Sequence, residues 1–388
     1  MATPLGERAI SEALGLGNAI LKFISPNDVG LTGGHQCGYY LPKAVWQMFA
    51  AFPPQRGRND EAEVAIHWHD GRITDSRVKW YGRGTRSEYR LTRFGRDFPF
   101  MTPDSVGDLL VLVPVNHREF LGFVLDLEED IEELQSALGI ETISSWAAFQ
   151  RGAPVTPPED EASCIDRQFR RFVDTLNGFP SGAAFSEETR RVLASCGGFE
   201  QLSADGALLR CMESEYRLFR LAERQLCQNE IIRVFRDVDD FLSTASSIMN
   251  RRKSRAGRSL ENHVDYLLSR AGIPHDMRPP ADGKPDILIP SLAAYRDPAY
   301  PPERLIVVGV KTTCKDRWRQ VLNEARRIPR KHILTTQQGI SGNQLTEMHG
   351  SGVTLIVPAD IQRQYPRSPI ELLTIEAFLT FVRNTLAP

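Results

Sequence analysis

Three residues in the last third of the chain have the types and spacing needed for metal-assisted hydrolysis of a phosphodiester. Asp286 stands at the head of the apolar segment KPDILIP (284–290), Lys311 ends the apolar segment that follows it, and Glu324 comes 13 residues later. Carboxylates hold hard divalent cations such as Mg²⁺. An ammonium group can orient the attacking water and stabilise charge on the phosphorane. The sequence therefore predicts a catalytic set of Asp286, Lys311 and Glu324, with the two carboxylates as Mg²⁺ ligands.

The second carboxylate of this set is expected to come from a helix. The usual nuclease pattern, PD…(D/E)xK, has an acidic residue two positions before the lysine, where this chain has Gly309. The apolar stripe of KDRWRQVLNEARRI (315–328) predicts a helix. Arg317 and Glu324, seven residues apart, would lie on nearly the same side of it, so that Glu324 could reach back toward the strand end.

This constellation also has a purely structural interpretation. A PD pair followed by a lysine is common by chance. Lys311 would then be a strand-end lysine whose ammonium reaches water. Glu324 would only pair with Arg327 or another neighbouring cation.

Three charged residues, Lys315, Asp316 and Arg317, follow the strand end closely. At a helix N-terminus directed at DNA, lysine and arginine can donate to guanine O6 and N7, and aspartate can accept from cytosine N4. The triplet therefore predicts reading of successive G·C pairs. The alternative is an ordinary first helical turn, in which Asp316 would favour the helix dipole and Lys315 would not.

The composition is that of a globular protein with unevenly distributed charge. The chain has 388 residues, 41% apolar and 25% charged, and its net charge of −2 gives no global case for nucleic-acid binding. RRKSRAGR (251–258) carries five cations and no anion, whereas LDLEEDIEEL (125–134) is acidic. Such clusters form either a basic face or a solvated surface.

Targeting signals and cysteine pairs are not evident in the sequence. No apolar run is long enough to cross a membrane, and the N-terminus does not read as a signal peptide. The six cysteines are scattered and never form CxxC. We therefore expect a reduced cytoplasmic protein without a zinc site or a disulfide framework.

The order of the patterns predicts a β-rich part, a linker, a helical part and an α/β part. Alternating segments separated by glycine-rich turns run to about residue 150, and RGAPVTPPEDE (151–161) is the clearest linker. Helical patterns follow, and strands then alternate with helices from residue 258 onward. In this last part at least two strands are expected to be parallel, in a sheet covered on both faces.

Several of these segments, taken in order, resemble the EcoRII-like restriction endonucleases. In the C-terminal part they are NRRKSRAGRSLE (250–261), GKPDILIP (283–290), GVKTTCKDRWRQVLNEA (309–325) and SGVTLIVP (351–358). In the N-terminal part they are SPNDVGLTGGHQCGYYLP (25–42) and TRSEYRLTRFGR (85–96). The resemblance implies a multidomain protein, with an N-terminal β-pseudobarrel that binds DNA and a C-terminal α/β restriction-endonuclease core.

The resemblance also implies an activity. EcoRII-like enzymes are homodimeric, Mg²⁺-dependent type IIE endonucleases that cut double-stranded DNA before the first C of 5′-CCWGG. A second copy of the site, bound by the N-terminal domain, relieves the block of the catalytic cleft. Relatives flip the central base, which fits tolerance of A or T there. The implied divisions are an effector domain (1–165), a hinge (166–180) and a catalytic domain (181–388).

Site residues follow from the resemblance position by position. The catalytic set is again Asp286, Lys311 and Glu324, and Glu261 is a further candidate for a metal-site carboxylate. The implied DNA contacts of the catalytic domain are Lys253, Arg255, Lys315, Asp316 and Arg317. The implied contacts of the effector domain are Lys22, His35, Tyr40, Arg86, Glu88 and Arg90. Gly84 and Tyr89 stand where lysines are expected, which bears on effector affinity more than on catalysis.

Three rival functions remain at this point. The chain could be a DNA-binding protein without nuclease activity, such as a repressor. It could be a nuclease of the same fold with a related site, CCNGG or CCSGG, because the flanking pairs are shared. It could also act in repair or on structured DNA, although the charged triplet and the two DNA-binding segments argue against that.

Overall fold

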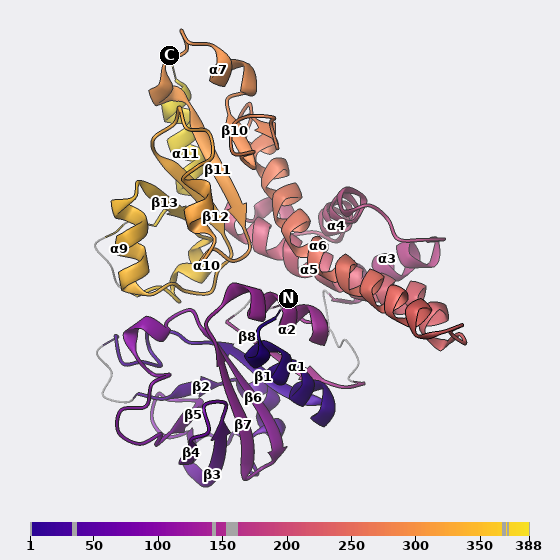
Figure 1. Cartoon of the computed structure of the whole chain (residues 1–388), viewed down its shortest axis with the longest axis vertical. Helices are drawn as coiled ribbons and strands as arrows, with labels where there is room; N and C mark the ends of the chain where they lie inside the picture. Colours follow the sequence, from indigo (N-terminus) through magenta and orange to yellow (C-terminus); the bar gives the residue numbers. More distant parts are fainter. Residues whose placement is uncertain are drawn as a thin grey trace. The chain divides into compact units, whose positions relative to one another are not determined.

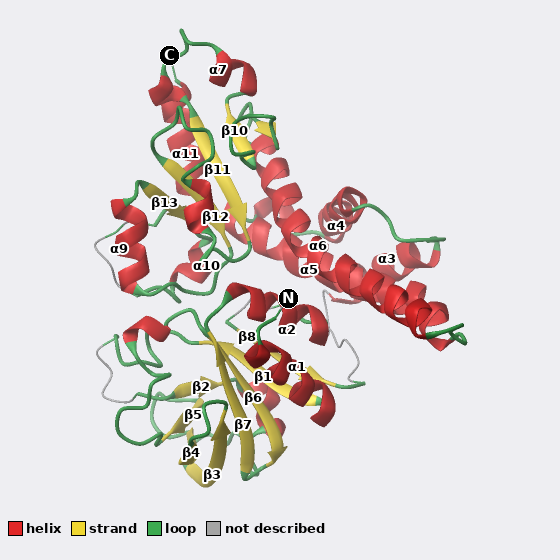
Figure 2. Ribbon diagram, viewed as in Figure 1, coloured by secondary structure: helices red, strands yellow, loops and turns green. Residues whose placement is uncertain are grey.

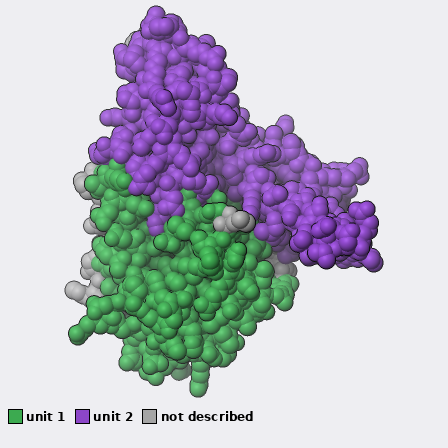
Figure 3. All heavy atoms as spheres, viewed as in Figure 1, with its two compact units in different colours: residues 1–153, 337–347, 361–371 green, residues 154–336, 348–360, 372–388 purple. Residues whose placement is uncertain are grey.

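The computed structural model describes residues 2–32, 37–141, 145–152, 162–366, 370 and 372–387 (Figure 1). The chain forms two compact units, coloured separately in Figure 3. Unit 1 contains residues 1–153, 337–347 and 361–371, and unit 2 contains residues 154–336, 348–360 and 372–388. Two short C-terminal segments thus belong to the same unit as the N-terminal part. The functional limits 1–165, 166–180 and 181–388 stay a prediction.

Unit 1 is built on one eight-stranded mixed sheet, visible as the yellow strands in the lower part of Figure 2. Its strand order is β2-β5-β4-β3-β7-β6-β1-β8. The strands are β1 (Asn18–Phe23), β2 (Tyr39–Leu41), β3 (Asp60–Trp68), β4 (Ile73–Tyr81), β5 (Glu88–Thr92), β6 (Leu109–Asn116), β7 (Glu119–Leu125) and β8 (Trp146–Gln150). The helical segments are α1 (Pro4–Leu16), η1 (Lys43–Met48), η2 (Pro103–Ser105) and α2 (Glu128–Leu138).

The sheet of unit 1 buries apolar side chains on both faces. Successive side chains of a strand point to opposite faces, and β6 accordingly sends Leu110 and Leu112 to one core and Leu109 and Val111 to the other. The first core is rich in aromatic residues, including Trp68. The second is closed by apolar residues of α1 and α2. This double burial explains why β6 reads as a nearly continuous apolar run, whereas β3 and β4 alternate.

Unit 2 combines a helical part with a five-stranded sheet. The helical segments are α3 (Ala162–Asp174), α4 (Gly182–Cys196), η3 (Phe199–Gln201), α5 (Ala204–Ile232), α6 (Val238–Arg270), α7 (Leu292–Arg296), η4 (Pro302–Arg304), α8 (Trp318–Val321), α10 (Ala359–Gln362) and α11 (Ile375–Leu386). Helix α9 (Gly342–Gly350) runs across the boundary between the two sets of residues, and so does α10, whose last two residues belong to unit 1. The strands are β9 (Asp276–Met277), β10 (Ile287–Ile289), β11 (Ile306–Lys311), β12 (Lys331–Thr335) and β13 (Val353–Ile356).

The sheet of unit 2 has the predicted parallel core. The order is β13-β12-β11-β10-β9. β11, β12 and β13 are parallel, whereas β10 pairs antiparallel with both β11 and β9. The predicted architecture, a β-rich N-terminal domain and an α/β C-terminal core, is confirmed. No helix in the described part of the chain is long and apolar enough to cross a membrane.

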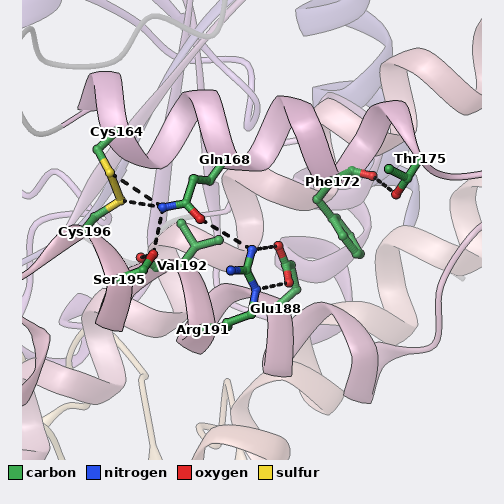
Figure 4. Close-up of polar contacts among 9 residues, drawn as sticks. All are labelled: Cys164, Gln168, Phe172, Thr175, Glu188, Arg191, Val192, Ser195 and Cys196. Atoms are coloured by element: carbon green, nitrogen blue, oxygen red, sulfur yellow. Dashed lines mark hydrogen bonds and ion pairs between the residues drawn. A yellow bond between two sulfur atoms is a disulfide. The ribbon is translucent and has the colours of Figure 1, made fainter.

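The expectation that the cysteines are all reduced is wrong for one pair. Cys164 on α3 and Cys196 on α4 form a disulfide across 32 residues of sequence (Figure 4). Figure 4 also shows Gln168, whose Nε2 donates to Ser195 Oγ at 2.7 Å beside the bridge. Packing of the two helices brings the sulfurs together, and cysteine spacing along the chain carries no signal for such a pair.

His332 on β12 gives unit 2 a pH-dependent stability. Its side chain is 3% exposed and lies 5.7 Å and 5.4 Å, between ring centres, from Phe378 and Phe381. Burial lowers the pKa of His332 to about 4. The unfolded chain therefore binds the extra proton first as the pH falls below about 6.5. The contribution of neutral His332 to the free energy of unfolding is therefore present at neutral pH and is lost as the pH falls toward 4.

The His332→Phe variant should lose this dependence. Between pH 7 and pH 5 the histidine should lower the free energy of unfolding by roughly 2 kcal/mol. Urea unfolding of wild type and variant at both pH values measures the difference. Equal losses on acidification in the two proteins would show that His332 does not couple protonation to folding.

Candidate active site

Asp286 and Lys311 are brought together by two antiparallel strands. Ile287 of β10 pairs with Val308 of β11, so Asp286, one residue before β10, lies beside the end of β11. Its Oδ2 accepts hydrogen bonds from the amide of Val310 at 2.7 Å and from Lys311 Nζ at 2.7 Å. The carboxylate is therefore fixed by the backbone and partly neutralised by the ammonium group.

Glu324 reaches the same place from a loop. The predicted helix over residues 315–328 is wrong, because α8 covers only Trp318–Val321 and turns follow it. Ala325 has a left-handed φ of +43°, and its amide donates to the backbone oxygen of Asp282 at 2.9 Å instead of continuing a helix. This conformation costs free energy for any residue except glycine and is incompatible with a right-handed helix. A helix therefore cannot continue through Ala325. The argument from helical spacing fails, but the juxtaposition it predicted is present.

Glu324 is a buried carboxylate whose charge interacts with those of Lys311 and Asp286. The side chain is 7% exposed, and its Oε2 has no hydrogen-bond partner within the described ranges. Burial raises the pKa of Glu324 to about 7, with the charge of Lys311 opposing the rise and that of Asp286 adding to it. A buried carboxylate oxygen without a partner is costly. A divalent cation shared with Asp286 would satisfy it.

The donor set fits Mg²⁺ better than a softer metal. The residues that the structure describes contain no group of three or more His, Cys, Asp or Glu that could hold a metal ion. Mg²⁺ is commonly bound by only one or two carboxylates, with waters and substrate phosphate completing its shell. Two carboxylates at a strand end are therefore sufficient, and Asp286 and Glu324 are the residues that would hold the ion.

The predicted base-reading triplet lies in the turn between β11 and α8. Lys315 is buried, Asp316 is exposed, and Arg317 donates from Nη2 to Thr313 Oγ1 at 2.9 Å. The expectation of a first helical turn is wrong, because residues 315–317 precede α8 as a turn. Lys311, the predicted catalytic lysine, is the last residue of β11, and the triplet begins four residues after it.

Lys253 and Arg255 do not share a surface. Lys253 is exposed on α6, whereas Arg255 is buried with its guanidinium 5.2 Å and 5.4 Å from the ring centres of Tyr216 and Phe219. Residues two apart on a helix point in nearly opposite directions. The structure therefore separates the two predicted DNA contacts, and Arg255 packs inside the helical part.

The basic segment 251–258 is largely neutralised from within. Arg252 makes two hydrogen bonds to Glu223, at 2.6 Å and 3.1 Å, and Arg251 pairs with Glu230 at 3.3 Å. Both acidic residues lie on α5. Much of the positive charge in this segment therefore joins α5 to α6.

Glu261 is held by a cation. Its Oε2 accepts a hydrogen bond from Arg278 Nε at 2.6 Å and another from Nη2 of the same arginine. The amide of Arg278 also donates to the backbone oxygen of Asp286 at 2.7 Å. Arg278 thus links Glu261 to Asp286, and Glu261 does not itself contact Asp286 through these bonds. Metal binding by the Glu261 carboxylate would require its ion pair with Arg278 to open.

Four predicted effector residues gather on strands β2 and β5 or beside them. Tyr40 pairs in register with Arg90. Arg90 donates to Glu88 Oε1 at 3.0 Å and to the backbone oxygen of Gly38 at 3.1 Å. The guanidinium of Arg86, just before β5, lies 5.3 Å from the ring centre of Tyr81 on β4. β2 is the edge of the sheet, so this cluster is at its margin.

The remaining effector predictions fare differently. Lys22 is buried and forms an ion pair with Asp28, whose other oxygen accepts the amide of Tyr40 at 2.8 Å. Lys22 therefore supports the loop that leads to β2. His35 lies outside the described residues. Tyr89, where a lysine is expected, is fully buried in the aromatic core. The tyrosine at this position therefore contributes to packing of the core.

Sequence reasoning missed the backbone amide of Val310 and the side chain of Lys331. The sequence from residue 311 to residue 331 contains eight cations, and Lys331 reads as one of them. Its side chain is nevertheless 3% exposed and donates to three backbone oxygens of the loop that carries Glu324. Its place directly before the apolar run HILTT was the available signal, because a lysine there must bury its stem.

Comparison with known proteins gives matches over both halves of the chain. The family described as "EcoRII C terminal" matches residues 219–379, and "Restriction endonuclease EcoRII, N-terminal" matches residues 18–147. The type II restriction enzyme EcoRII of Escherichia coli is 33% identical over 376 residues, covering 92% of each protein. The type II restriction enzyme SsoII of Shigella sonnei is 24% identical over 148 residues, covering 35% of this chain and 47% of that one.

Two solved DNA complexes are also similar in structure. Metal-depleted Ecl18kI with uncleaved, modified DNA has a TM-score of 0.45 and 18% identity, covering 56% of this chain and 83% of that one. A complex of the restriction endonuclease PspGI with substrate DNA has a TM-score of 0.44 and 14% identity, covering 54% of this chain and 93% of that one.

Proposed function

This chain belongs to the EcoRII family of type II restriction endonucleases and is a site-specific deoxyribonuclease; from that premise we propose its site, its metal and its control. It cuts double-stranded DNA before the first C of 5′-CCWGG, and Asp286 and Glu324 bind the Mg²⁺ that the reaction needs. The observation that carries the metal assignment is the partnerless, buried oxygen of Glu324 beside the Asp286–Lys311 pair.

The reaction is hydrolysis, and each residue of the set has one task. The oxygen of a water molecule attacks phosphorus, and one P–O ester bond breaks in the same displacement. The water gives one proton to bulk solvent and the departing oxygen takes one up, so the products end in a phosphate monoester and a hydroxyl group. Bound Mg²⁺ would supply Lewis-acid stabilisation of the phosphate charge. Lys311 holds its ammonium at Asp286, where it can donate to the attacking water and to the phosphate oxygens. The amide of Val310 keeps Asp286 at the strand end while charge develops.

The base-reading turn accounts for the flanking pairs of the site. Lys315 and Arg317 supply donors for guanine, and Asp316 supplies an acceptor for cytosine. The turn follows β11, which ends in Lys311, with three residues between them, and this short connection supports a coupling of base reading to cutting. The central W follows from family membership and from base flipping, which removes that pair from direct reading.

A panel of short duplexes separates the proposed site from its rivals. The duplexes differ only in the central pair of CCXGG and are incubated with Mg²⁺ or with a chelator. We expect cutting with A·T or T·A at the centre, no cutting with G·C or C·G, and none with chelator. Cutting of all four would indicate CCNGG, and cutting only with G·C or C·G at the centre would indicate CCSGG. Specific binding without any cutting would favour the repressor-like rival.

A second site bound by the N-terminal part is proposed to activate cutting. Support comes from the composition of unit 1, which includes residues 337–347 and 361–371 from the region that matches the EcoRII C-terminal family. Within this unit Asn343 donates to Asp104 Oδ1 at 2.7 Å. Effector DNA that binds the β2–β5 margin could therefore change how unit 1 holds these two segments.

The active form is proposed to be a homodimer in the bacterial cytoplasm. A palindromic site matches a twofold dimer in which each subunit cuts one strand. The apolar tip, defined here as residues 231–242 at the turn from α5 to α6, is suited to this contact. Among the described residues it contains six of the thirteen exposed large apolar side chains: Ile231, Ile232, Val234, Val238, Phe241 and Leu242.

A second copy is the occupant that the apolar tip fits best. The tip carries cations and anions side by side, with Arg233 bound to Asp240 at 2.7 Å, so twofold pairing can match opposite charges. Val238, Phe241 and Leu242 lie on one helical face at i, i+3 and i+4. Twelve residues supply about half of the roughly 20–30 per side that a standard interface uses.

The dimer contact can be tested by sedimentation velocity. The double variant Phe241→Ser/Leu242→Ser should sediment as a monomer at concentrations where wild type is a dimer, because removing two large apolar side chains weakens association. Ile73→Ser, which changes an exposed apolar residue of unit 1, is the matched control and should leave the dimer intact. A double variant that remains dimeric would move the interface elsewhere.

A further inference from the structure

The loop that carries Glu324 is closed around one buried ammonium group. Lys331 begins β12 and is 3% exposed. Its Nζ donates to the backbone oxygens of Ala325 at 3.0 Å and Ile328 at 2.6 Å, and also to that of Glu324. An ammonium group has three N–H donors, and here three backbone oxygens accept from it. Lys331 therefore acts as a clamp on the backbone of this loop.

The same loop is also bound by the turn that leads into β10. Asp282 accepts the amide of Ala325 at its backbone oxygen, at 2.9 Å, and the amide of Arg326 at Oδ2, at 2.7 Å. A Cβ at Gly283 would stand 2.6 Å from Glu324 Cα, closer than atoms can approach. The segments that carry the two acidic residues of the site are thus in direct contact. Movement of one would displace the other.

Strand register connects this clamp to the catalytic lysine. Lys331 pairs with Val307 of β11 on one side and with Val353 of β13 on the other. The base of its side chain is therefore fixed at the centre of the sheet, and its ammonium fixes the loop. β11 ends in Lys311, so one rigid sheet sets the position of the loop relative to that residue.

We propose that Lys331 is a positioning residue for the metal site: by occupying the carbonyl cage of the loop, it holds Glu324 so that its partnerless oxygen faces Asp286 and Lys311. This inference rests on the proposed function, because it needs the metal pair. Lys331 would act on the metal pair only through the backbone of this loop, to which its ammonium donates. Without its ammonium the three backbone oxygens lose their donor, the loop relaxes, and the two carboxylates no longer converge.

If Lys331 positions the metal site, its variants should lose metal affinity while they still fold and bind the duplex. If it supports the whole fold, they should lose all three properties together. Lys331→Met keeps the volume and removes the charge. We expect its Mn²⁺ affinity, measured by electron paramagnetic resonance with duplex present, to fall about tenfold or more, as when residues supporting metal ligands are replaced. The Mg²⁺ concentration for half-maximal cleavage should rise in parallel. Metal-free binding of a CCWGG duplex should change little, because the DNA-reading turn is not part of the cage. The thermal midpoint should fall, because three buried acceptors lose their donor, but the variant should stay folded at the assay temperature.

Chemical rescue adds a second readout. Lys331→Ala leaves a space lined by three carbonyl oxygens, and propylammonium matches the atoms removed beyond Cβ. Added propylammonium should restore part of the Mn²⁺ affinity of Lys331→Ala and should not affect wild type or Glu324→Gln. Arg330→Met removes the neighbouring exposed cation of the same loop and is the matched control, with unchanged metal affinity expected.

The outcomes separate this inference from the function on which it rests. Wild-type protein that binds no Mn²⁺ and cuts no DNA would overturn the proposed function. Wild type that does both, with Lys331→Met unchanged in Mn²⁺ affinity, would overturn only the positioning role. Parallel loss of folding, duplex binding and metal binding in both Lys331 variants, without rescue, would show that Lys331 supports the fold as a whole.

Discussion

Replacing Asp286 by alanine should abolish cleavage while leaving specific DNA binding largely intact. The variant loses a metal ligand and the group that holds the ammonium of Lys311. Loss of metal-assisted charge stabilisation raises the activation free energy by several kcal/mol. The cleavage rate should therefore fall at least about a thousandfold. Binding should change little, because phosphate contacts and base reading come from other residues. Single-turnover cleavage and a filter-binding titration of the same duplex measure both quantities.

The specificity of this effect is checked with an acidic residue outside the site. Glu303 is exposed on η4, and Glu303→Ala removes the same charge from unit 2 without touching the metal pair. It should cut at the wild-type rate. Cleavage by Asp286→Ala near that rate would show that the metal site is wrongly assigned.

Removing residues 1–165 should free the enzyme from its need for a second site. If the N-terminal part restrains the catalytic part, the deletion variant should cut a single-site substrate roughly 10–100-fold faster than the full chain, the range of a coupling free energy of about 1–3 kcal/mol. The comparison is made on plasmids with one and with two CCWGG sites. A deletion variant that does not cut the single-site plasmid, yet cuts it when effector duplex is added, would contradict the autoinhibition hypothesis.

A point substitution tests the same restraint in the full chain. Gly107 has a φ of +91°, and a Cβ there would stand 2.3 Å from the backbone oxygen of Gly339. Gly107→Ala should therefore push the segment 337–347 away within unit 1 and raise single-site cutting. Gly71 has a φ of +90° with nothing within 4 Å of the added Cβ. Gly71→Ala carries the same backbone strain and should leave single-site cutting low.

The parts of the fold that follow from local patterns were predictable. The β-rich part to about residue 150 and the alternation of strands and helices after residue 258 lie where the structure has them. Burial of one face of a strand leaves an alternating apolar pattern, and burial of both faces leaves a continuous one. Asp286 and Lys311 could be placed together for the same reason. Each stands at the end of an apolar strand, and neighbouring strands bring such ends to one edge.

The parts that depend on long-range contacts were not predictable. The stripe at residues 315–328 has helical spacing, but Ala325 is held by Asp282 and Lys331, which come from other segments. Glu324 therefore meets Asp286 for a reason that helical spacing does not contain. Arg255 reads as a surface cation and packs against aromatic rings instead. The sequence also does not indicate that Arg252 pairs with Glu223, because that partner lies on a different helix.

The central claim is that this chain cuts at 5′-CCWGG with a metal held by Asp286 and Glu324. The most direct test is a digest of a sequenced plasmid with several CCWGG sites, with Mg²⁺ or with chelator, followed by sequencing of the cut ends. The account predicts discrete fragments only with Mg²⁺, each beginning at the first C of CCWGG. Ends at other sequences would contradict the site, and an uncut plasmid, even with short CCWGG duplexes added as effector, would contradict the nuclease itself.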